Sequence, residues 1–405
     1  MTPYTSFHFF VIALIVLLPV IILGLFGKRS KVYNFISTAI MIVIIFADKK
    51  HNLFGISYIS YPLISFIAYI LWQTLIIKVY ERMTSQNRST SYYVLALVLS
   101  IAPLFMVKLL QSSWLGKGQL HMHSSKLVEL FAFLGISYIT FKSVQLIMEI
   151  HDHTLKEKVD VKKLIQFISF FPTISSGPID RYRRFKKDDD KELTKERYRQ
   201  LLGKAIHFIM LGFLYKYIIA YVIQNYGVKP YTGHLETFGD YWFYMYTYSF
   251  YLFFDFAGYS LFAIALSYIY GIETPMNFNQ PFRAKNIKDF WNRWHMTLSF
   301  WFRDCIYMRF VFFMAKKKYI KSTFHVSNIA FLLNFGIMGL WHGFEWFYVA
   351  YGLYHALLFF LYNYYEKWRK KRFGKWNHPV INVLSIVITF HFVAFGFLIF
   401  SGQLI

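Results

Sequence analysis

Residues 9–26 read FFVIALIVLLPVIILGLF, and this stretch decides the class of protein. It lies within a segment, 1–27, that carries no Asp, Glu, Lys or Arg. A membrane-spanning helix needs about 20 predominantly apolar residues. We therefore expect a transmembrane helix here.

A cleaved signal peptide is the alternative for this segment, and it fits poorly. The positive charges Lys28, Arg29 and Lys31 follow the apolar run instead of preceding it, and no small-residue cleavage site is evident. By the positive-inside rule, the N-terminus faces outward and the loop 28–33 faces the cytosol.

The composition extends this prediction to the whole chain. Of its 405 residues, 56% are hydrophobic and 16% charged, against about 25% charged in soluble domains. The net charge of +23 would suggest nucleic acid in a soluble protein. Here the charge falls in short loops between apolar segments, so it indicates a cytoplasmic face beside anionic lipids, and no nucleic-acid partner is expected. The single cysteine, Cys305, excludes an intrachain disulfide.

The apolar segments predict an all-α polytopic membrane protein with ten or eleven spans in one integral membrane domain, 1–405. They lie at about 6–26, 34–47, 57–79, 91–110, 127–149, 204–224, 240–271, 328–341, 345–365 and 379–402. The segment 240–271 is long enough for one tilted helix or two. A further piece, 164–176, is too short to span and is predicted to be a re-entrant helix buried in protein. The charged loops 180–204, 303–321 and 366–375 are predicted to be cytoplasmic, and the side of the C-terminus depends on the parity of the spans.

Asp255 is the only charged residue between Tyr241 and Ile272. A charge in an apolar segment costs about 2.5–3.5 kcal/mol on insertion. It is either a buried carboxylate that orders the bundle, which the residues alone favour, or a proton relay or substrate contact.

His295 lies in NIKDFWNRWHMTLSFWFRD, residues 286–304, which has the period of one amphipathic helix. That period places three apolar side chains on one side and three polar ones on the other: Trp291, Leu298, Phe302 and Lys288, Asn292, Ser299. On spacing alone, a partly buried histidine with both nitrogens satisfied is favoured over a functional one.

His342 lies in NFGIMGLWHGFEW, residues 334–346, between glycines that allow close approach of a ligand. A capping or interfacial histidine is an equal alternative. Histidine can take a proton from an attacking hydroxyl and later return it to a leaving group. A site within the bilayer would also exclude water, which competes as a nucleophile.

Other catalytic signatures are missing from the sequence. There is no G-x-S-x-G elbow, P-loop or H-E-x-x-H motif. The pairs His121/His123 and His151/His153 are weak metal signals, and no metal site is expected.

Five blocks together resemble the membrane-bound O-acyltransferase family. They are GISYITF (135–141), FFPTISSGPIDRYRRF (170–185), FDFAGYS (254–260), NFNQPFRAKNIKDFWNRWHMTLSFWFRD (277–304) and GLWHG (339–343). They occur in the family's order and spacing. The resemblance implies a helical bundle around a central tunnel, with N-terminal spans in 1–126, the family core in 127–365, and a basic loop and last span in 366–405.

The resemblance also implies roles for individual residues. His342 matches the family's signature histidine, which is expected to be catalytic, and His295 matches a second motif position, in the family mostly Asn or His. Further matches, with substrate or tunnel roles implied, are Asp255, Tyr259, Ser260, Trp291 and Arg293, and the indole N–H of Trp341 is a candidate donor to an oxyanion.

Within the family, the blocks most resemble members that attach D-alanine to teichoic acid in Gram-positive bacteria. Leu261 and Met276 stand where alginate-acetylating members commonly carry acidic residues. The resemblance implies that the chain binds no cofactor of its own and uses the 4′-phosphopantetheine thioester of a cytosolic D-alanyl carrier protein (DltC-like). A DltD-like membrane or extracellular partner, a teichoic acid acceptor and a cell-membrane location are implied as well.

The segment 306–321 is the candidate docking surface for that carrier. It combines apolar residues with basic ones that suit an acidic partner: Ile306, Met308, Val311, Phe312, Lys316 and Lys317. An ordinary interfacial helix with snorkelling lysines is an equal alternative.

Three rival functions remain open from the sequence. The protein could acetylate an exported polysaccharide or lipid, transport a solute, or serve as a non-catalytic membrane scaffold. A transporter is expected to show paired charges or repeated broken helices, and the sequence suggests neither. Whether the acyl group passes directly to the polymer or through a partner's hydroxyl also stays open.

Overall fold

The computed structural model describes residues 2–47, 52–53, 56–86, 89–112, 132–155, 157–373 and 378–404. Apart from a short hairpin of β1 (Asn52–Leu53) and β2 (Ile56–Ser60), their regular structure is helical. Seven helical runs in these ranges are long and apolar enough to cross a membrane: Phe7–Leu25, Tyr61–Ser85, Thr90–Leu110, Lys195–Tyr231, Phe238–Ile269, Thr323–His342 and Pro379–Phe400. The prediction of an all-α multi-pass membrane protein is confirmed.

The number of long apolar helices is smaller than the ten or eleven predicted spans. Three other predicted spans correspond to helices of a different kind: α2 (Lys31–Phe46) and α6 (Ile136–His151) have 16 residues each, and α16 (Trp346–Phe373) ends in a basic stretch. The predicted segment 127–149 begins outside the described residues. The segment 240–271, left open as one helix or two, is the single helix α11 (Phe238–Ile269).

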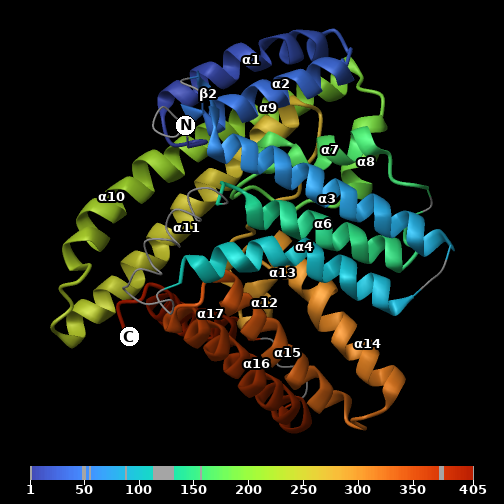
Figure 1. Ribbon diagram of the computed structural model, residues 1–405. Helices are drawn as coiled ribbons and strands as arrows, with labels where there is room; N and C mark the ends of the chain where they lie inside the picture. The colour runs from blue at the N-terminus through green and yellow to red at the C-terminus, as the bar shows by residue number, and fades with distance from the viewer. Residues whose placement is uncertain are drawn as a thin grey trace. The chain divides into compact units, whose positions relative to one another are not determined.

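The chain divides into two compact units, and the first comprises Met1–Gln111, Leu115–Gly212 and Tyr259–Pro275. It contains α1 (Phe7–Leu25), α2, α3 (Tyr61–Gln86), α4 (Thr90–Leu110), α6, α7 (Val161–Ser169), η2 (Phe171–Thr173), α8 (Tyr182–Asp190), α9 (Lys195–Phe213) and the end of α11. Helices α3, α4 and α6 pack side by side (Figure 1). On α1, Phe7 and Ile15 are 73% and 66% exposed, as expected of a helix that faces lipid.

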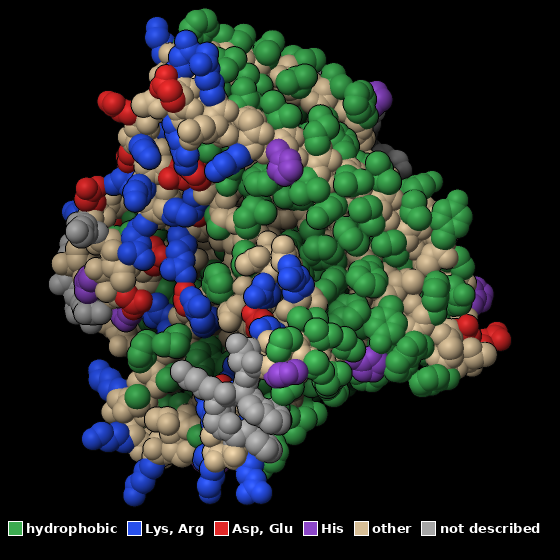
Figure 2. All heavy atoms as spheres, turned by 180° about the vertical axis from the view of Figure 1, so that it is seen from behind, with side chains coloured by type: hydrophobic (Ala, Val, Ile, Leu, Met, Phe, Trp, Pro, Cys, Tyr) green, Lys and Arg blue, Asp and Glu red, His purple; other side chains and the backbone are tan. Residues whose placement is uncertain are grey.

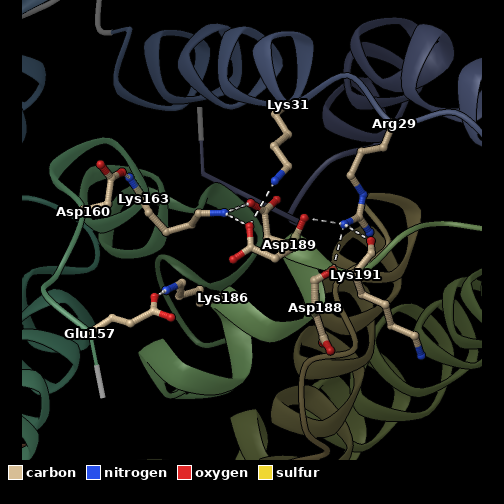
Figure 3. A network of polar contacts seen from close by, with 10 residues as sticks. Arg29, Lys31, Glu157, Asp160, Lys163, Lys186, Asp188, Asp189 and Lys191 are labelled. Carbon is tan, nitrogen blue, oxygen red and sulfur yellow. Dashed lines mark hydrogen bonds and ion pairs between the residues drawn. The ribbon is translucent and has the colours of Figure 1, made fainter. Parts of the chain in front are cut away.

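Polar contacts join the loop after α1 to α7 and α8 (Figure 3). The Arg29 guanidinium donates to the carbonyl oxygens of Asp188 (2.7 Å), Asp189 (2.9 Å) and Gly271 (3.0 Å). The ammonium groups of Lys31 and Lys163 both bind the Asp190 carboxylate, at 3.0 and 2.6 Å. The loops 28–33 and 180–204, each predicted to be cytoplasmic, therefore meet in one network.

We expect Arg29→Ala to destabilise the first unit by about 2–3 kcal/mol, because several main-chain carbonyls lose a charged donor together. Thermal unfolding of the purified protein in detergent would measure the change. Lys28→Ala removes an exposed positive charge from the neighbouring position and should leave the unfolding temperature unchanged. Equal unfolding temperatures for the Arg29→Ala and Lys28→Ala proteins would contradict this role of Arg29.

The predicted re-entrant segment 164–176 forms α7 and η2, and its two ends reach opposite ends of α1. At its start, Lys163 joins the network beside Arg29, which follows α1. At its tip, the carbonyl oxygen of Pro172 accepts a hydrogen bond from the Tyr4 hydroxyl (3.2 Å), which precedes α1. Residues 170–175 are all buried. The segment is therefore short and enclosed by protein, as predicted, and its re-entrant course stays a prediction.

The second unit comprises Ser112–Trp114, Phe213–Gly258 and Met276–Ile405. In chain order it contains η3 (Leu214–Ala220), α10 (Tyr221–Ile223), η4 (Gln224–Val228), η5 (Lys229–Tyr231), the first part of α11, η6 (Pro281–Arg283), α12 (Ile287–Trp291), α13 (Met296–Phe302), η7 (Arg303–Tyr307), α14 (Met308–Lys317), α15 (Thr323–His342), α16 and α17 (Pro379–Phe400). Helices α15, α16 and α17 lie side by side (Figure 1). Figure 2 shows hydrophobic side chains over a broad part of the face that it displays.

The side of the C-terminus follows from α17. The backbone N–H of Gly233 donates to Oε1 of Gln403 at 2.7 Å, so the end of α17 lies beside the loop before α11. The other end of α17 follows the basic stretch at the end of α16. If that stretch is cytoplasmic, as the positive-inside rule predicts, Gln403 lies on the outer side.

Candidate functional site

The segment 286–304 is not the continuous amphipathic helix that its period predicts. Two short helices, α12 and α13, are separated by residues 292–295. The upstream segment 277–279 causes the break, because Asn279 N–H donates to the carbonyl of Arg293 (2.9 Å) and Met296 N–H donates to the carbonyl of Asn277 (2.8 Å). These tertiary hydrogen bonds replace helical ones, and a local period cannot reveal them.

His295 occupies the break in a left-handed conformation, with φ of +41°. Its side chain is 3% exposed, and neither ring nitrogen has a hydrogen-bond partner among the described residues. The prediction of a histidine with both ring nitrogens hydrogen-bonded is therefore wrong. Burial, with a smaller contribution from His342, lowers the pKa of His295 to about 3. The ring is neutral at physiological pH, with one nitrogen as donor and the other as acceptor.

His342 is the last residue of α15 and is half-buried. Aromatic rings surround it, with centroids at 4.5 Å (Trp341), 4.9 Å (Phe400) and 5.8 Å (Tyr348). His295 and His342 are close enough for a charge on one ring to act on the other. Both predicted catalytic histidines and Trp341 therefore lie in the second unit, with the Trp341 ring against His342.

Two of the glycines near His342, Gly339 and Gly343, serve helix packing instead of the predicted access for a ligand, whereas Gly336 faces open space. A side chain at Gly339 would collide with the backbone of α16 at Tyr348 and Gly352. A side chain at Gly343 would meet the Tyr348 ring. Small residues of this kind let two membrane helices approach closely.

A cavity of about 200 Å³ lies between the segment that carries His295 and the helix that carries His342. Trp291, Asn292 and Ser299 line it from α12–α13, and Asn334 and Met338 from α15. Met338 precedes His342 by one helical turn, about 6 Å along the axis. The buried Oδ1 of Asn334 has no hydrogen-bond partner among the described residues. The cavity therefore offers an unused polar group on α15, two helical turns before His342.

Comparison with known proteins decides the family of this chain. Residues 52–401 match the model of the membrane-bound O-acyltransferase family. This chain belongs to that family. Its membership agrees with the resemblance carried by the five sequence blocks.

Three relatives show where in the membrane-bound O-acyltransferase family the chain lies. The teichoic acid D-alanyltransferase of Bacillus subtilis is 52% identical over 100% of this chain and 98% of its own length. The teichoic acid D-alanyltransferase of Lacticaseibacillus rhamnosus is 44% identical over 99% and 97%. The probable alginate O-acetylase AlgI of Pseudomonas aeruginosa is 30% identical over 67% of this chain and 49% of its own length. The full-length similarity is to the D-alanylating (DltB-type) members.

In this membrane-bound O-acyltransferase, Asp255 forms an ion pair with Lys216. Sequence analysis did not identify this partner, although a lysine in the interior of the apolar segment 204–224 was a signal for it. The pair supports a structural role for Asp255, but the predicted burial is wrong, because its side chain is 37% exposed. It is also one of the paired charges expected of a transporter.

The other family-motif residues have mainly structural contacts. Trp291 donates from its indole N–H to Nδ1 of His355 (3.3 Å), and the Arg293 guanidinium binds the Asp289 carboxylate (2.7 Å). Tyr259 and Ser260 belong to the first unit, where the Tyr259 hydroxyl pairs with Ser175 at 2.6 Å. The histidines belong to the second unit.

His355 is a residue that sequence analysis missed. It is fully buried in α16, and its ring lies 4.6 Å from that of Tyr351. A histidine within the apolar segment 345–365 was the available signal. Because its Nδ1 accepts the hydrogen bond from Trp291, it helps to hold the end of α12 beside the cavity.

The structure describes one of the two histidine pairs that are weak metal signals. Nδ1 of His151 shares a hydrogen bond with the Tyr80 hydroxyl at 2.8 Å, and its ring stacks on Tyr93 at 3.9 Å, which accounts for its position. His121 and His123 lie outside the described residues. Within the described ranges, no group of three or more His, Cys, Asp or Glu residues is arranged to hold a metal ion.

The candidate docking surface coincides with η7 and α14. Phe312 is 64% exposed, Val311 is half-buried, and Lys316 and Lys317 are exposed at the end of the helix. Ile306 and Met308 are half-buried. An apolar strip with a basic end is therefore accessible on α14.

Proposed function

We propose that this protein transfers D-alanine from a thioester to a hydroxyl for teichoic acid D-alanylation. The observation that carries the proposal is the pairing of His342 with a buried, unsatisfied His295 beside a cavity. The full-length similarity to two teichoic acid D-alanyltransferases supports the choice of acyl group and acceptor. Transfer of labelled D-alanine by membranes that contain the protein and its proposed carrier would test it.

The proposed reaction uses His342 as the general base. Its imidazole takes the proton of the acceptor hydroxyl while the oxygen attacks the thioester carbonyl. The tetrahedral intermediate then collapses and the C–S bond breaks. The sulfur takes the proton that His342 held and leaves as the free thiol. A neutral His295 donates from one ring nitrogen to the oxyanion, or holds the acyl chain, and its buried setting strengthens either hydrogen bond.

The proposed donor is D-alanine on the 4′-phosphopantetheine of a cytosolic carrier. A pantetheine arm is flexible and carries amide N–H groups. The cavity between α12–α13 and α15 offers Asn334 as an acceptor for one of them, one turn before Met338 and two turns before His342. The arm would thereby be held at a fixed depth.

Asn334→Leu should raise the KM for the carrier thioester roughly three- to tenfold, because one neutral hydrogen bond contributes about 0.5–1.5 kcal/mol. The kcat should change little. Steady-state transfer measured against carrier concentration would give both constants. Met338→Leu alters the same cavity without removing a polar group and serves as the control. An unchanged KM in the Asn334→Leu protein would exclude the contact.

The proposed docking site for the carrier is the exposed strip of α14. Val311→Asp places a negative charge where an acidic carrier would approach, and should weaken carrier binding at least tenfold. Pull-down or calorimetric titration with the purified carrier would measure it. Phe313→Asp makes the same charge change at a neighbouring exposed position outside the strip and should have a smaller effect. If Val311→Asp bound and transferred normally, α14 would not be the docking site.

Acetylation of an exported polysaccharide is the second candidate, favoured by the partial similarity to alginate O-acetylases. Supplying acetyl and D-alanyl thioesters in parallel would distinguish the two. A scaffold would retain function without His342. A direct transfer and a relay through a DltD-like partner would differ in whether a labelled acyl-protein accumulates on that partner.

A further inference from the structure

A groove of about 430 Å³ lies at the start of α12, between α16 and α17, whose ribbons run side by side in Figure 1. It is larger than the cavity between α12–α13 and α15, and the two share no lining residue. Its volume falls within the range of small-ligand sites, about 300–1,000 Å³. The proposed acyl transfer assigns no ligand to this groove.

The walls of the groove are apolar and open sideways. Leu361 of α16 is 53% exposed, and Ile388 and Phe392 of α17 are 55% and 49% exposed. Both helices belong to predicted spans, so these side chains face lipid. An acyl chain can enter such a groove from the membrane without crossing a polar surface.

The groove runs from the cytoplasmic interface into one leaflet. Tyr365 lies directly before the basic stretch that ends α16, and Ser385 lies two turns into α17. Phe392 is 13 residues after Pro379, about 20 Å along the axis, near the middle of a hydrocarbon core of roughly 30 Å. Tyrosines such as Tyr362 and Tyr365 are typical of the interface.

The interfacial end of the groove is positively charged. Lys285 is exposed, and its ammonium has no ion pair or hydrogen bond within the described residues. Its neighbour Lys288 is already neutralised by Glu366 at 2.7 Å, and Lys370 shares the same carboxylate at 2.9 Å. Lys285 is thus an uncommitted cation at the mouth of an apolar groove.

We propose that this groove binds an anionic glycerophospholipid of the cytoplasmic leaflet, with an acyl chain between α16 and α17 and the phosphate on Lys285. Basic sites between membrane helices on the cytoplasmic side favour anionic headgroups. The bound lipid would contact Lys285, Asn286 and Ile287, which lead into α12. It would therefore support the segment that ends at His295. The proposal does not depend on which acyl group the protein transfers.

Native mass spectrometry of the full-length protein can test this site. The protein is equilibrated with mixed micelles that contain equal amounts of phosphatidylglycerol and phosphatidylcholine, and the retained lipids are counted. We expect a roughly fivefold preference for one phosphatidylglycerol, since one lysine near the surface contributes about that factor. Lys285→Gln should reduce the preference to near parity, and Lys321→Gln, at another exposed lysine, should leave it intact.

Ser385→Phe provides the second arm, because it places a ring in the groove and leaves Lys285 in place. It should lose the tightly retained lipid of either type, with gel filtration and unfolding temperature reporting that the fold is kept. Equal retention of both lipids by the wild type would overturn the proposal. So would a Lys285→Gln protein that keeps the full preference.

Discussion

Replacing His342 by alanine should lower D-alanyl transfer about 10²- to 10⁴-fold, the usual contribution of a general base. The expectation rests on the position of His342 at the end of α15, within electrostatic reach of His295 and one turn after Met338, which lines the cavity. Since the ring takes a proton only as the hydroxyl attacks, the loss should fall on kcat more than on the KM for the carrier. Labelled D-alanine transferred by reconstituted vesicles would measure both constants.

His325→Ala is the matched control for that experiment. It removes an imidazole from the same helix, α15, but at an exposed position in its first turn. It should transfer D-alanine at the wild-type rate. Comparable protein levels and unfolding temperatures for the two variants would separate chemistry from folding. Full activity in the His342→Ala protein would refute the proposed mechanism.

Replacing His295 by leucine should lower kcat about 10²- to 10³-fold, the effect of losing one donor to an oxyanion. Leucine also tolerates the left-handed backbone poorly, so some loss of stability is expected. Asparagine tolerates that conformation and keeps an N–H donor. We therefore expect His295→Asn to retain transfer within roughly tenfold of the wild type.

The pH dependence of transfer provides an independent check on His295. Burial lowers the pKa of this histidine to about 3, so its ring stays neutral between pH 5 and 8. The transfer rates of the wild-type and His295→Asn proteins should then fall in the same way as the pH is lowered through that range. A fall that shifts to another pH in the His295→Asn protein would mean that His295 itself takes up the proton.

Much of the fold follows from local sequence physics. The run 9–26 forms α1, the basic loops after α1 and α7 meet in one network, and the segment 164–176 is short and largely buried in protein. Each depends on hydrophobicity and charge over a short stretch, and these local properties determine how a segment inserts into the membrane. The two histidines were likewise identified before the structure placed them together.

The features that sequence analysis missed depend on partners distant in the chain. The break at His295 comes from hydrogen bonds to Asn277 and Asn279, which no helical period encodes. Asp255 seemed solitary because Lys216 lies on another span. The role of Gly339 was misassigned, because only the packing of α15 on α16 shows what its missing side chain avoids.

The ion pair between Lys216 and Asp255 has a consequence for biogenesis. The two residues are 39 positions apart, so Lys216 leaves the ribosome first. At about 5–20 residues per second, its span waits roughly 2–8 s for the neutralising carboxylate. During that interval a bare lysine in the bilayer costs about 2.5–3.5 kcal/mol. The pair thus links the retention of one span to the synthesis of a later one, and a chain truncated before α11 should insert its preceding span poorly.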